Sequence, residues 1–384
     1  MIRVLHVTED HSARNTGISS AVDALTRCAP DNILPAIAFT GDEPLPSPAG
    51  VVLYAFPIGG VTKAWRFAPG AEQALAQAVA AADVVHLHGL WMWVQWSAAR
   101  LAWRLHKPFV VTPHGMLEDW IWQRQAWPHR LKKFIYWNAL AYPAFRRASA
   151  LHALTSGEAA TLAVHFPGRQ AEVIPHGIDL QAIDTRLSGL PPQDNTQPPY
   201  FLFLGRLHPV KAIHLLIRAF ARLPGNVFTL KIAGPAQPQE QAYAASLRQL
   251  AADLGLGERV VFNGAVQGEA KWQLYRDAWA FCLPSFTEVI GMANLEAAAA
   301  GTPVITSYES GVVEDWETCG GLRVHPDEDS ILAGLQQAQA WSFAERSARG
   351  KTLRTLVETR YSWQQVGQQW AAVYQRLSGG SEHV

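Results

Sequence analysis

Short apolar runs alternate with longer amphipathic stretches along the chain. In the first half, runs rich in Val, Ile, Leu and Phe predict strands at 3–8, 33–39, 51–55, 83–88, 109–113, 150–155 and 172–175. Helix-length segments separate most of these runs, for example 18–28, 71–81 and 91–105. Strands that are continuously apolar and separated by helices indicate a parallel sheet that is covered on both faces.

The second half repeats this pattern after a break in composition. Strands are predicted at 200–205, 229–233, 259–262, 280–283, 303–306 and 322–325. The stretch 188–199, SGLPPQDNTQPP, is polar and proline-rich, which is typical of a semi-stiff linker. We therefore expect an α/β fold of two Rossmann-like, doubly wound domains, 1–187 and 200–361, that face each other across a cleft. Helical spacing of apolar residues within 362–384 predicts a C-terminal helix that crosses back to the first domain.

Charge and cysteine usage exclude some classes of protein. The 384 residues include 32 Lys+Arg and 32 Asp+Glu, so the chain lacks the net positive charge that attracts a nucleic-acid backbone. Cys28, Cys282 and Cys319 lie far apart, which argues against a disulfide framework or a cysteine zinc site and fits a reducing compartment. The first residues, MIRVLHVTED, predict a strand and not a signal peptide. We expect a cytoplasmic protein.

The segment 284–306, PSFTEVIGMANLEAAAAGTPVIT, carries the densest candidate chemistry. It predicts a strand end, a loop, and a helix from about Met292 that ends near Gly301. At the start of this helix, Gly291 lets a ligand approach the backbone, where unpaired amides and the helix dipole favour a phosphate. Glu288 and Glu296 lie eight residues apart, or about 12 Å along an ideal helix. A retaining glycosidase needs its carboxyls roughly 5–5.5 Å apart, so this pair does not fit that chemistry.

The spacing of the two glutamates suits a long ligand with a hydroxyl-rich group at each end and a charged middle, as in a nucleotide-sugar. Alternatively, Glu296 is a solvated helix residue and Glu288 a loop acid. A second feature supports the ligand: the strand 200–205 ends at Gly205, and Arg206 and Lys211 flank the following loop. Two cations and free amides at a strand-to-helix loop would bind a diphosphate. Surface salt bridges are the alternative role for these two side chains.

These motifs together resemble those of the retaining glycosyltransferases of family 4, which have the GT-B fold. The matching segments are GRLHPVK at 205–211, the glutamate pair, IPHGID at 174–179, NGAV at 263–266, TPHG at 112–115 and YSW at 361–363. They follow the family's order along nearly the whole chain. The chain also resembles bacterial glycosyltransferases of exopolysaccharide, capsule or lipopolysaccharide synthesis.

The resemblance implies a role for each matching residue. Glu288 would contact the hydroxyls of the donor sugar and Glu296 those of the ribose, while Arg206 and Lys211 would bind the diphosphate. The other donor-side positions are the base-holding loop at Val266, the amides near the helix start, and two glycines of the phosphate loops: Val266, Ile290, Gly291, Met292, Gly205 and Gly17.

In the first half, the resemblance implicates His114 of TPHG, which would contact the donor sugar near the reacting centre. A core histidine with satisfied hydrogen bonds is the alternative. Two positions depart from the family pattern. The first loop offers only Gly17 where the family has a double glycine, and Ala212 stands where a glycine commonly follows the lysine.

Two short motifs invite a metal hypothesis. His86 and His88 lie two residues apart on a predicted strand and so point the same way, but the sequence offers no evident third ligand nearby. The acids at 327–329 precede a predicted helix, where a solvated turn with helix N-terminal acids is expected. We therefore expect no metal and no cofactor.

The segment 119–147 mixes aromatic and basic residues. Such a stretch can lie on an anionic membrane surface, hold a lipid-diphosphate acceptor, or stack on the rings of an oligosaccharide. The alternative is that its tryptophans are core and its basic residues a solvated helix face. The acceptor-side candidates are Trp120, Arg124, Lys132 and Lys133.

The sequence thus predicts a metal-independent, retaining hexosyltransferase that moves a sugar from a nucleotide-diphosphate donor to a hydroxyl of a glycan or lipid-linked glycan. The implied mechanism is front-face displacement, in which a donor phosphate oxygen takes the acceptor proton. Two alternatives remain: a nucleotide-sugar epimerase on the same fold, and a catalytically silent subunit that binds a sugar-nucleotide or a glycan. The expected location is the cytoplasm, at the inner face of the cell membrane if 119–147 contacts lipid.

Overall fold

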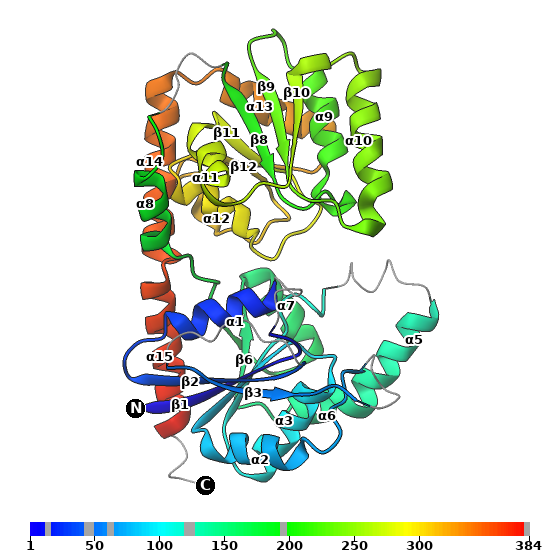
Figure 1. Cartoon of the computed structure of the whole chain (residues 1–384), viewed down its shortest axis with the longest axis vertical. Coiled ribbons are helices and arrows are strands. Elements are labelled where there is room, and N and C mark those ends of the chain that lie inside the picture. Colours follow the sequence, from blue (N-terminus) through cyan, green and yellow to red (C-terminus); the bar gives the residue numbers. More distant parts are fainter. Residues whose placement is uncertain (12–16, 42–49, 60–64, 119–126, 193–197, 380–384) are drawn as a thin grey trace. The chain divides into compact units, whose positions relative to one another are not determined.

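The structure is a computed structural model that describes the chain except residues 12–16, 42–49, 60–64, 119–126, 193–197 and 380–384 (Figure 1). Its contacts divide the chain into two compact units. Unit 1 is Met1–Gly177 with Trp363–Val384, and unit 2 is Ile178–Ser362. Residues 178–187, which the sequence pattern assigned to the first domain, lie in unit 2. Part of the predicted linker, 193–197, lies outside the described residues.

Unit 1 contains a seven-stranded parallel sheet in the order β3-β2-β1-β4-β5-β6-β7. Every apolar run predicted as a strand in the first half forms one of its members. Their bounds are β1 Ile2–Thr8, β2 Ile33–Thr40, β3 Val52–Phe56, β4 Val84–His88, β5 Phe109–Thr112, β6 Ala150–Ala153 and β7 Ala171–Val173.

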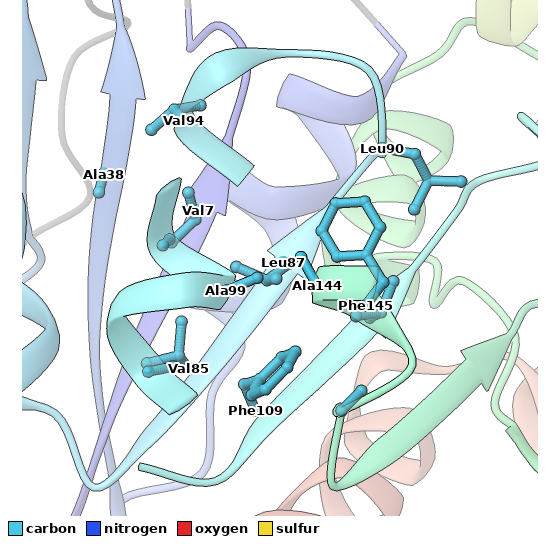
Figure 2. Close-up of a cluster of buried hydrophobic side chains, with 14 of the residues drawn as sticks. Val7, Ala38, Val85, Leu87, Leu90, Val94, Ala99, Phe109, Ala144 and Phe145 are labelled. Carbon is cyan, nitrogen blue, oxygen red and sulfur yellow. The ribbon is translucent and has the colours of Figure 1, made fainter. Parts of the chain in front are cut away.

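One face of this sheet packs against α2 (Glu72–Ala81), α3 (Trp93–Arg104) and α6 (Tyr142–Phe145). Because successive strand residues point to opposite faces, Val85 and Leu87 of β4 lie in this apolar layer (Figure 2). The other helices of the unit are α1 Ile18–Arg27, α5 Trp127–Tyr136, α7 Ser156–His165 and α15 Trp363–Gly379, and a π-helical turn, Trp137–Ala141, joins α5 to α6.

The opposite face of the sheet packs against α15, the last helix of the chain. Trp363 and Trp370 of α15 lie in a buried cluster with Val4 and Val84 of the strands. Gly177 lies against this helix, because a Cβ at that position would come within 2.4 Å of the Trp363 ring. The even-numbered residues of β4, including His86 and His88, therefore point toward α15.

Unit 2 contains a six-stranded parallel sheet in the order β10-β9-β8-β11-β12-β13. Its strands are β8 Tyr200–Leu204, β9 Thr229–Ala233, β10 Val260–Gly264, β11 Ala280–Leu283, β12 Val304–Ser307 and β13 Leu322–Val324. The helices are α8 Leu180–Ser188, α9 Ile213–Ala221, α10 Gln241–Asp253, α11 Gly268–Asp277, α12 Met292–Ala299, α13 Glu328–Gln339 and α14 Phe343–Arg360. The structure thus confirms the predicted fold of two Rossmann-like domains, each with a parallel sheet.

In both sheets the strand order reverses beside the first strand of the unit, between β1 and β4 and between β8 and β11. Ligands of doubly wound sheets bind outside the carboxyl ends of the strands at such a reversal. A ligand of either unit is therefore expected at these strand ends. Separately, none of the described helices combines the length and the apolar character needed to cross a membrane.

Candidate functional site

The loop after β8 carries the predicted phosphate-binding residues of unit 2. Gly205 continues the strand edge, since its N–H donates to the carbonyl of Ala233 at 3.0 Å. A 3-10 turn, Pro209–Lys211, follows and leads into α9. Ala212 joins the turn to the helix with φ +53°, which places it in the left-handed region. Glycine adopts that region without strain, so the backbone keeps the conformation that a glycine would provide while alanine bears the steric cost.

Lys211 forms an ion pair with Glu288, so residues 77 positions apart meet at one place. The Phe286 N–H donates to the Val210 carbonyl at 2.8 Å and holds the two loops together. Burial and the nearby Arg206 guanidinium lower the pKa of Lys211 to about 8. Arg206 itself is exposed. Two cations that repel one another, one of them partly desolvated, form a site that a bound anion would stabilise.

Gly291 begins α12 in the left-handed conformation, with φ +69°. A Cβ at this position would lie 2.8 Å from Nδ2 of Asn294, so a side chain there requires movement of the helix start. Around this helix start, three buried polar atoms have no hydrogen-bond partner in the described part of the chain: Ser285 Oγ, Asn294 Oδ1 and Ser307 Oγ. Buried polar atoms are normally paired, so this region has unused hydrogen-bonding capacity.

Glu296, one turn further along α12, is held by two residues of α11. Lys271 Nζ lies 2.6 Å from Oε1, and the Tyr275 hydroxyl donates to Oε2 at 2.9 Å. Both partners, which lie four residues apart on α11, were missed in the sequence analysis. Burial, and to a lesser extent the neighbouring Glu296 charge, raises the pKa of Tyr275. The hydroxyl therefore stays protonated and can donate a hydrogen bond to Glu296.

The remaining predicted donor-side residues lie in different environments. Ile290 is buried, whereas Met292 is exposed at the start of α12. Val266 lines a groove of about 770 Å³ in unit 2 together with residues that include Asn263, Lys231 and Arg346. In unit 1, Gly17 is exposed and its carbonyl accepts from the Ala21 N–H, but the loop 12–16 before it lies outside the described residues.

His114 follows β5 in unit 1 with φ +54°, another left-handed position occupied by a residue other than glycine. The next peptide is anchored by Glu158, a buried glutamate of α7 that the sequence did not single out. Its Oε1 accepts from the Gly115 N–H at 2.6 Å and its Oε2 from the Leu154 N–H at 2.7 Å. The cost of the His114 backbone conformation is thus offset by a carboxylate with two backbone donors.

The metal hypothesis for HLHG lacked a third ligand, and here the structure corrects the sequence reasoning. The parallel register pairs His6 of β1 with His86 of β4, which brings His6 beside His86 and His88. One potential ligand atom from each of the three buried rings lies within 4.8 Å of the others. Burial lowers the pKa of His6 to about 3 and lowers those of the other two rings as well, so all three are neutral. However, both ring nitrogens of His86 and of His88 are hydrogen-bonded within the protein. A metal ion would have to displace some of these hydrogen bonds in order to bind.

The acceptor-side candidates fall partly outside the described residues: Trp120 and Arg124 lie in the segment 119–126. Lys132 and Lys133 lie on α5, a helix with no buried residue that lies at the periphery of unit 1 (Figure 1). Lys133 Nζ lies 5.2 Å from the centroid of the Trp91 ring. The side chains of Trp127 and Phe134 on the same helix are 73% and 61% exposed.

Comparisons with known proteins identify the family of this chain. Residues 17–182 match the family described as "Glycosyltransferase Family 4", and residues 191–338 match "Glycosyl transferases group 1". Together the two matches cover most of the chain. An uncharacterized glycosyltransferase of Methanocaldococcus jannaschii is 32% identical over 221 residues, which are 54% of this chain and 54% of that protein.

D-inositol 3-phosphate glycosyltransferase of Mycobacteroides abscessus is 33% identical over 190 residues, or 44% of this chain and 42% of that protein. The chain therefore spans about half the length, or less, of these curated relatives. Among solved structures, Anabaena Alr3699/HepE in complex with UDP superposes with a TM-score of 0.77 at 19% identity, covering 98% of this chain and 100% of that one. Sucrose-phosphate synthase from Thermosynechococcus elongatus gives 0.71 at 20% identity, covering 99% and 100%. These likenesses establish the shared fold.

Proposed function

Because this chain belongs to the group 1 and family 4 glycosyltransferases of GT-B fold, we propose that it transfers a sugar from a nucleotide-diphosphate sugar to a hydroxyl of a glycan or lipid-linked glycan. One observation carries the proposal. Around α12 of unit 2, each of the two motif glutamates is paired with a lysine, Glu288 with Lys211 and Glu296 with Lys271.

We assign Arg206 and Lys211 to the diphosphate of the donor. When the donor binds, its phosphate oxygens compete with Glu288 for Lys211, and the carboxylate is released to accept hydrogen bonds from sugar hydroxyls. The positive charge that held Glu288 then stabilises the leaving diphosphate, where most of the negative charge develops during transfer. Both side chains are largely buried, so separating the pair is costly unless another charged group replaces one partner.

We assign Glu296 to the ribose. Lys271 and Tyr275 each occupy one lone pair of its oxygens, and a carboxylate has about four acceptor positions, so further ones remain for the two ribose hydroxyls. The lysine pairs with the carboxylate of Glu296 and the tyrosine fixes its orientation. From unit 1, His114 is assigned to the donor sugar.

The transfer is proposed to retain the configuration of the sugar by front-face displacement. A donor phosphate oxygen takes the proton of the acceptor hydroxyl, so no protein base is needed. No divalent metal is proposed, since the cations at the diphosphate are supplied by the protein. Transfer that persists in excess EDTA supports this point, and transfer that is lost and restored by Mg²⁺ or Mn²⁺ contradicts it.

The first test is donor binding. UDP-glucose is the first donor to try, since Alr3699/HepE has been solved in complex with it. Thermal shift should be measured with UDP-, GDP- and ADP-sugars, because a ligand that binds only the folded state raises the melting temperature. Nucleoside diphosphate released only in the presence of acceptor supports transfer. Interconversion of the donor without acceptor would indicate an epimerase, and binding without turnover would indicate a silent subunit.

The acceptor is proposed to be a lipid-linked glycan of surface polysaccharide synthesis, reached by α5 on an anionic membrane. Trp127, Leu131, Phe134 and Ile135 are exposed at helical spacing, and α5 carries Arg130, Lys132 and Lys133 but no acid. Apolar side chains with neighbouring cations are typical of helices that lie in a lipid interface.

Vesicle co-sedimentation tests this second proposal. The protein should bind vesicles that contain phosphatidylglycerol at low salt and dissociate at high salt or from pure phosphatidylcholine. F134S should weaken binding, while F343S, which changes a Phe of unit 2 with a similar exposed fraction of 60%, should not. Equal behaviour of the two variants would contradict a role for α5.

A further inference from the structure

Three histidines of unit 1 form an unbroken hydrogen-bonded chain that ends at the predicted sugar-contacting residue. His6 Nδ1 lies 3.0 Å from His88 Nε2, and His88 Nδ1 lies 3.0 Å from His114 Nε2. The residues come from β1, from β4 and from the loop after β5. His6 and His88 are 1% and 2% exposed, so water does not substitute for these contacts.

The chain of rings can hold its protons in only two ways. Burial lowers the pKa of all three histidines, so each ring is neutral and has one N–H donor and one acceptor nitrogen. If His6 donates from Nδ1, then His88 accepts at Nε2 and donates from Nδ1, and His114 accepts at Nε2 and carries its proton on Nδ1. If His114 donates from Nε2 instead, every ring carries its proton on Nε2. Mixed patterns would place two donors or two acceptors face to face.

We propose that His88 is a positioning residue that fixes the tautomer and ring orientation of His114 by coupling it to His6. The inference rests on the proposed function, in which His114 contacts the donor sugar. The tautomer determines whether Nδ1 of His114 presents a donor or an acceptor, so a wrong tautomer removes or inverts the hydrogen bond to a sugar hydroxyl.

A second chain in the same layer provides an internal control because its direction is fixed. His152 Nε2 contacts the Ile174 carbonyl at 2.8 Å, and a carbonyl can only accept. It follows that Thr112 donates to His152, that His86 donates from Nε2 to Thr112, and that the Tyr374 hydroxyl of α15 donates to His86. This second chain has one arrangement and contains no hydrogen bond to His114.

The first test uses the unmodified protein without any donor. Nitrogen-15 NMR of histidine-labelled protein reports which ring nitrogen is protonated. His6, His88 and His114 should all show the same tautomer, either Nδ1–H or Nε2–H, while His86 and His152 should both show Nε2–H. Different tautomers among the first three rings would overturn the inference. So would a stoichiometric metal bound to His6, His86 and His88, measured by elemental analysis of the purified protein.

Two variants of His88 separate positioning from mere structure. The amide group of asparagine stands at the level of Nδ1, which faces His114, whereas that of glutamine stands at the level of Nε2, which faces His6. Each variant leaves one neighbour unpaired, so melting temperatures should fall comparably. Neither variant links His114 to His6, so both should show mixed His114 tautomers. H88N keeps a hydrogen-bonding group beside the His114 ring and should lower kcat less than H88Q, which should lower it by about 10- to 100-fold.

Two further outcomes decide between the inference and the proposed function. Y374F, which removes the first donor of the second chain, should leave the His114 tautomer unchanged. Normal turnover in H88N or H88Q, with mixed His114 tautomers, would contradict the coupling of tautomer to transfer. If the NMR pattern is as expected and the unmodified protein transfers no sugar, the proposed function fails while the coupled chain stands.

Discussion

In unit 2, the polar side chains around the start of α12 are charged and pair with opposite charges, Lys211 with Glu288 and Lys271 with Glu296. In unit 1, the corresponding end of the sheet carries neutral histidines that pair with one another, such as His6 with His88. The two sheets have similar strand orders, so the difference lies in the residues at the strand ends and not in the topology. Charged pairs can be exchanged for a charged ligand, whereas a neutral hydrogen-bonded network suits uncharged hydroxyl groups. The two units thus present similar sheet edges that carry different side chains, neutral in unit 1 and charged in unit 2.

The largest expected effect comes from the charged pair of unit 2. K211A or E288Q should lower kcat/KM for transfer by about 100- to 1,000-fold, because each removes a group proposed to act on the diphosphate or the sugar. The melting temperature should also fall, since each change leaves a largely buried partner unpaired, so transfer is compared per mole of folded protein. K351A, a change at an exposed lysine of α14, is the control. Turnover near the normal rate in K211A would contradict a role for the Lys211–Glu288 pair in transfer.

Acid should affect unit 1 before unit 2. Burial lowers the pKa of His6 and His152 to about 3 and that of His176 to about 4, below the ordinary value of 6.5. Their stabilising neutral form is therefore fully present above about pH 6.5, and stability is lost as the pH falls toward the folded values. Each such histidine lowers the free energy of unfolding by about 1.4 kcal/mol per pH unit in that window.

Hydrogen exchange at pH 7.5, 6 and 5, corrected for intrinsic rates, measures this difference. Peptides from β4 and β6 should lose protection at a higher pH than peptides from β8 and β11. Simultaneous loss in both units would show that the neutral histidines do not set the acid stability of unit 1.

The anchor of the His114 loop should have an intermediate effect. E158Q replaces one acceptor oxygen by an NH₂ group that faces a backbone N–H, so unfolding free energy should fall by about 1–3 kcal/mol. Glu72 also lies in the first turn of its helix, α2, but is exposed, so E72Q should cost less than about 1 kcal/mol. Chemical denaturation of both variants measures the contrast, and equal losses would show that the carboxylate does not hold the loop.

The smallest effect concerns the alkaline range. Since the pKa of Lys211 is about 8, its charge is lost above that pH, and kcat/KM should fall by up to about tenfold per pH unit. K211R should shift this decline to higher pH, because guanidinium stays charged. A pH–rate profile of the two proteins checks the prediction, and an unshifted decline in K211R would assign the titration to another group.

The pattern of apolar residues was sufficient to predict the strands and the two sheets. An apolar run such as 109–113 indicates a buried strand whichever strands it pairs with. Register was not predictable in this way. His6 lies beside His86 only because β1 and β4 pair with a particular offset, and no local pattern encodes that offset. Glu158 was missed for a similar reason, since its partners Gly115 and Leu154 come from the ends of two other strands.

The candidate site divides in the same way. The glutamates and the Arg206–Lys211 loop could be found because they belong to local motifs, whereas Lys271 and Tyr275 act through a neighbouring helix. Ala212, which stands where the family commonly has a glycine, shows a limit of prediction from motifs. The position requires a left-handed backbone, and the sequence alone does not reveal that alanine adopts it here.

The packing of α15 onto unit 1 has a consequence for biosynthesis. Trp363 and Trp370 complete a buried layer whose strands are made at the beginning of the chain. During translation, unit 2 emerges whole and can fold as a unit, whereas unit 1 must keep one face of its sheet uncovered until residues 363–379 leave the ribosome. The first half of the nascent chain therefore depends on α15, which is made after the whole of unit 2. During that interval the uncovered face is exposed to aggregation and to chaperones.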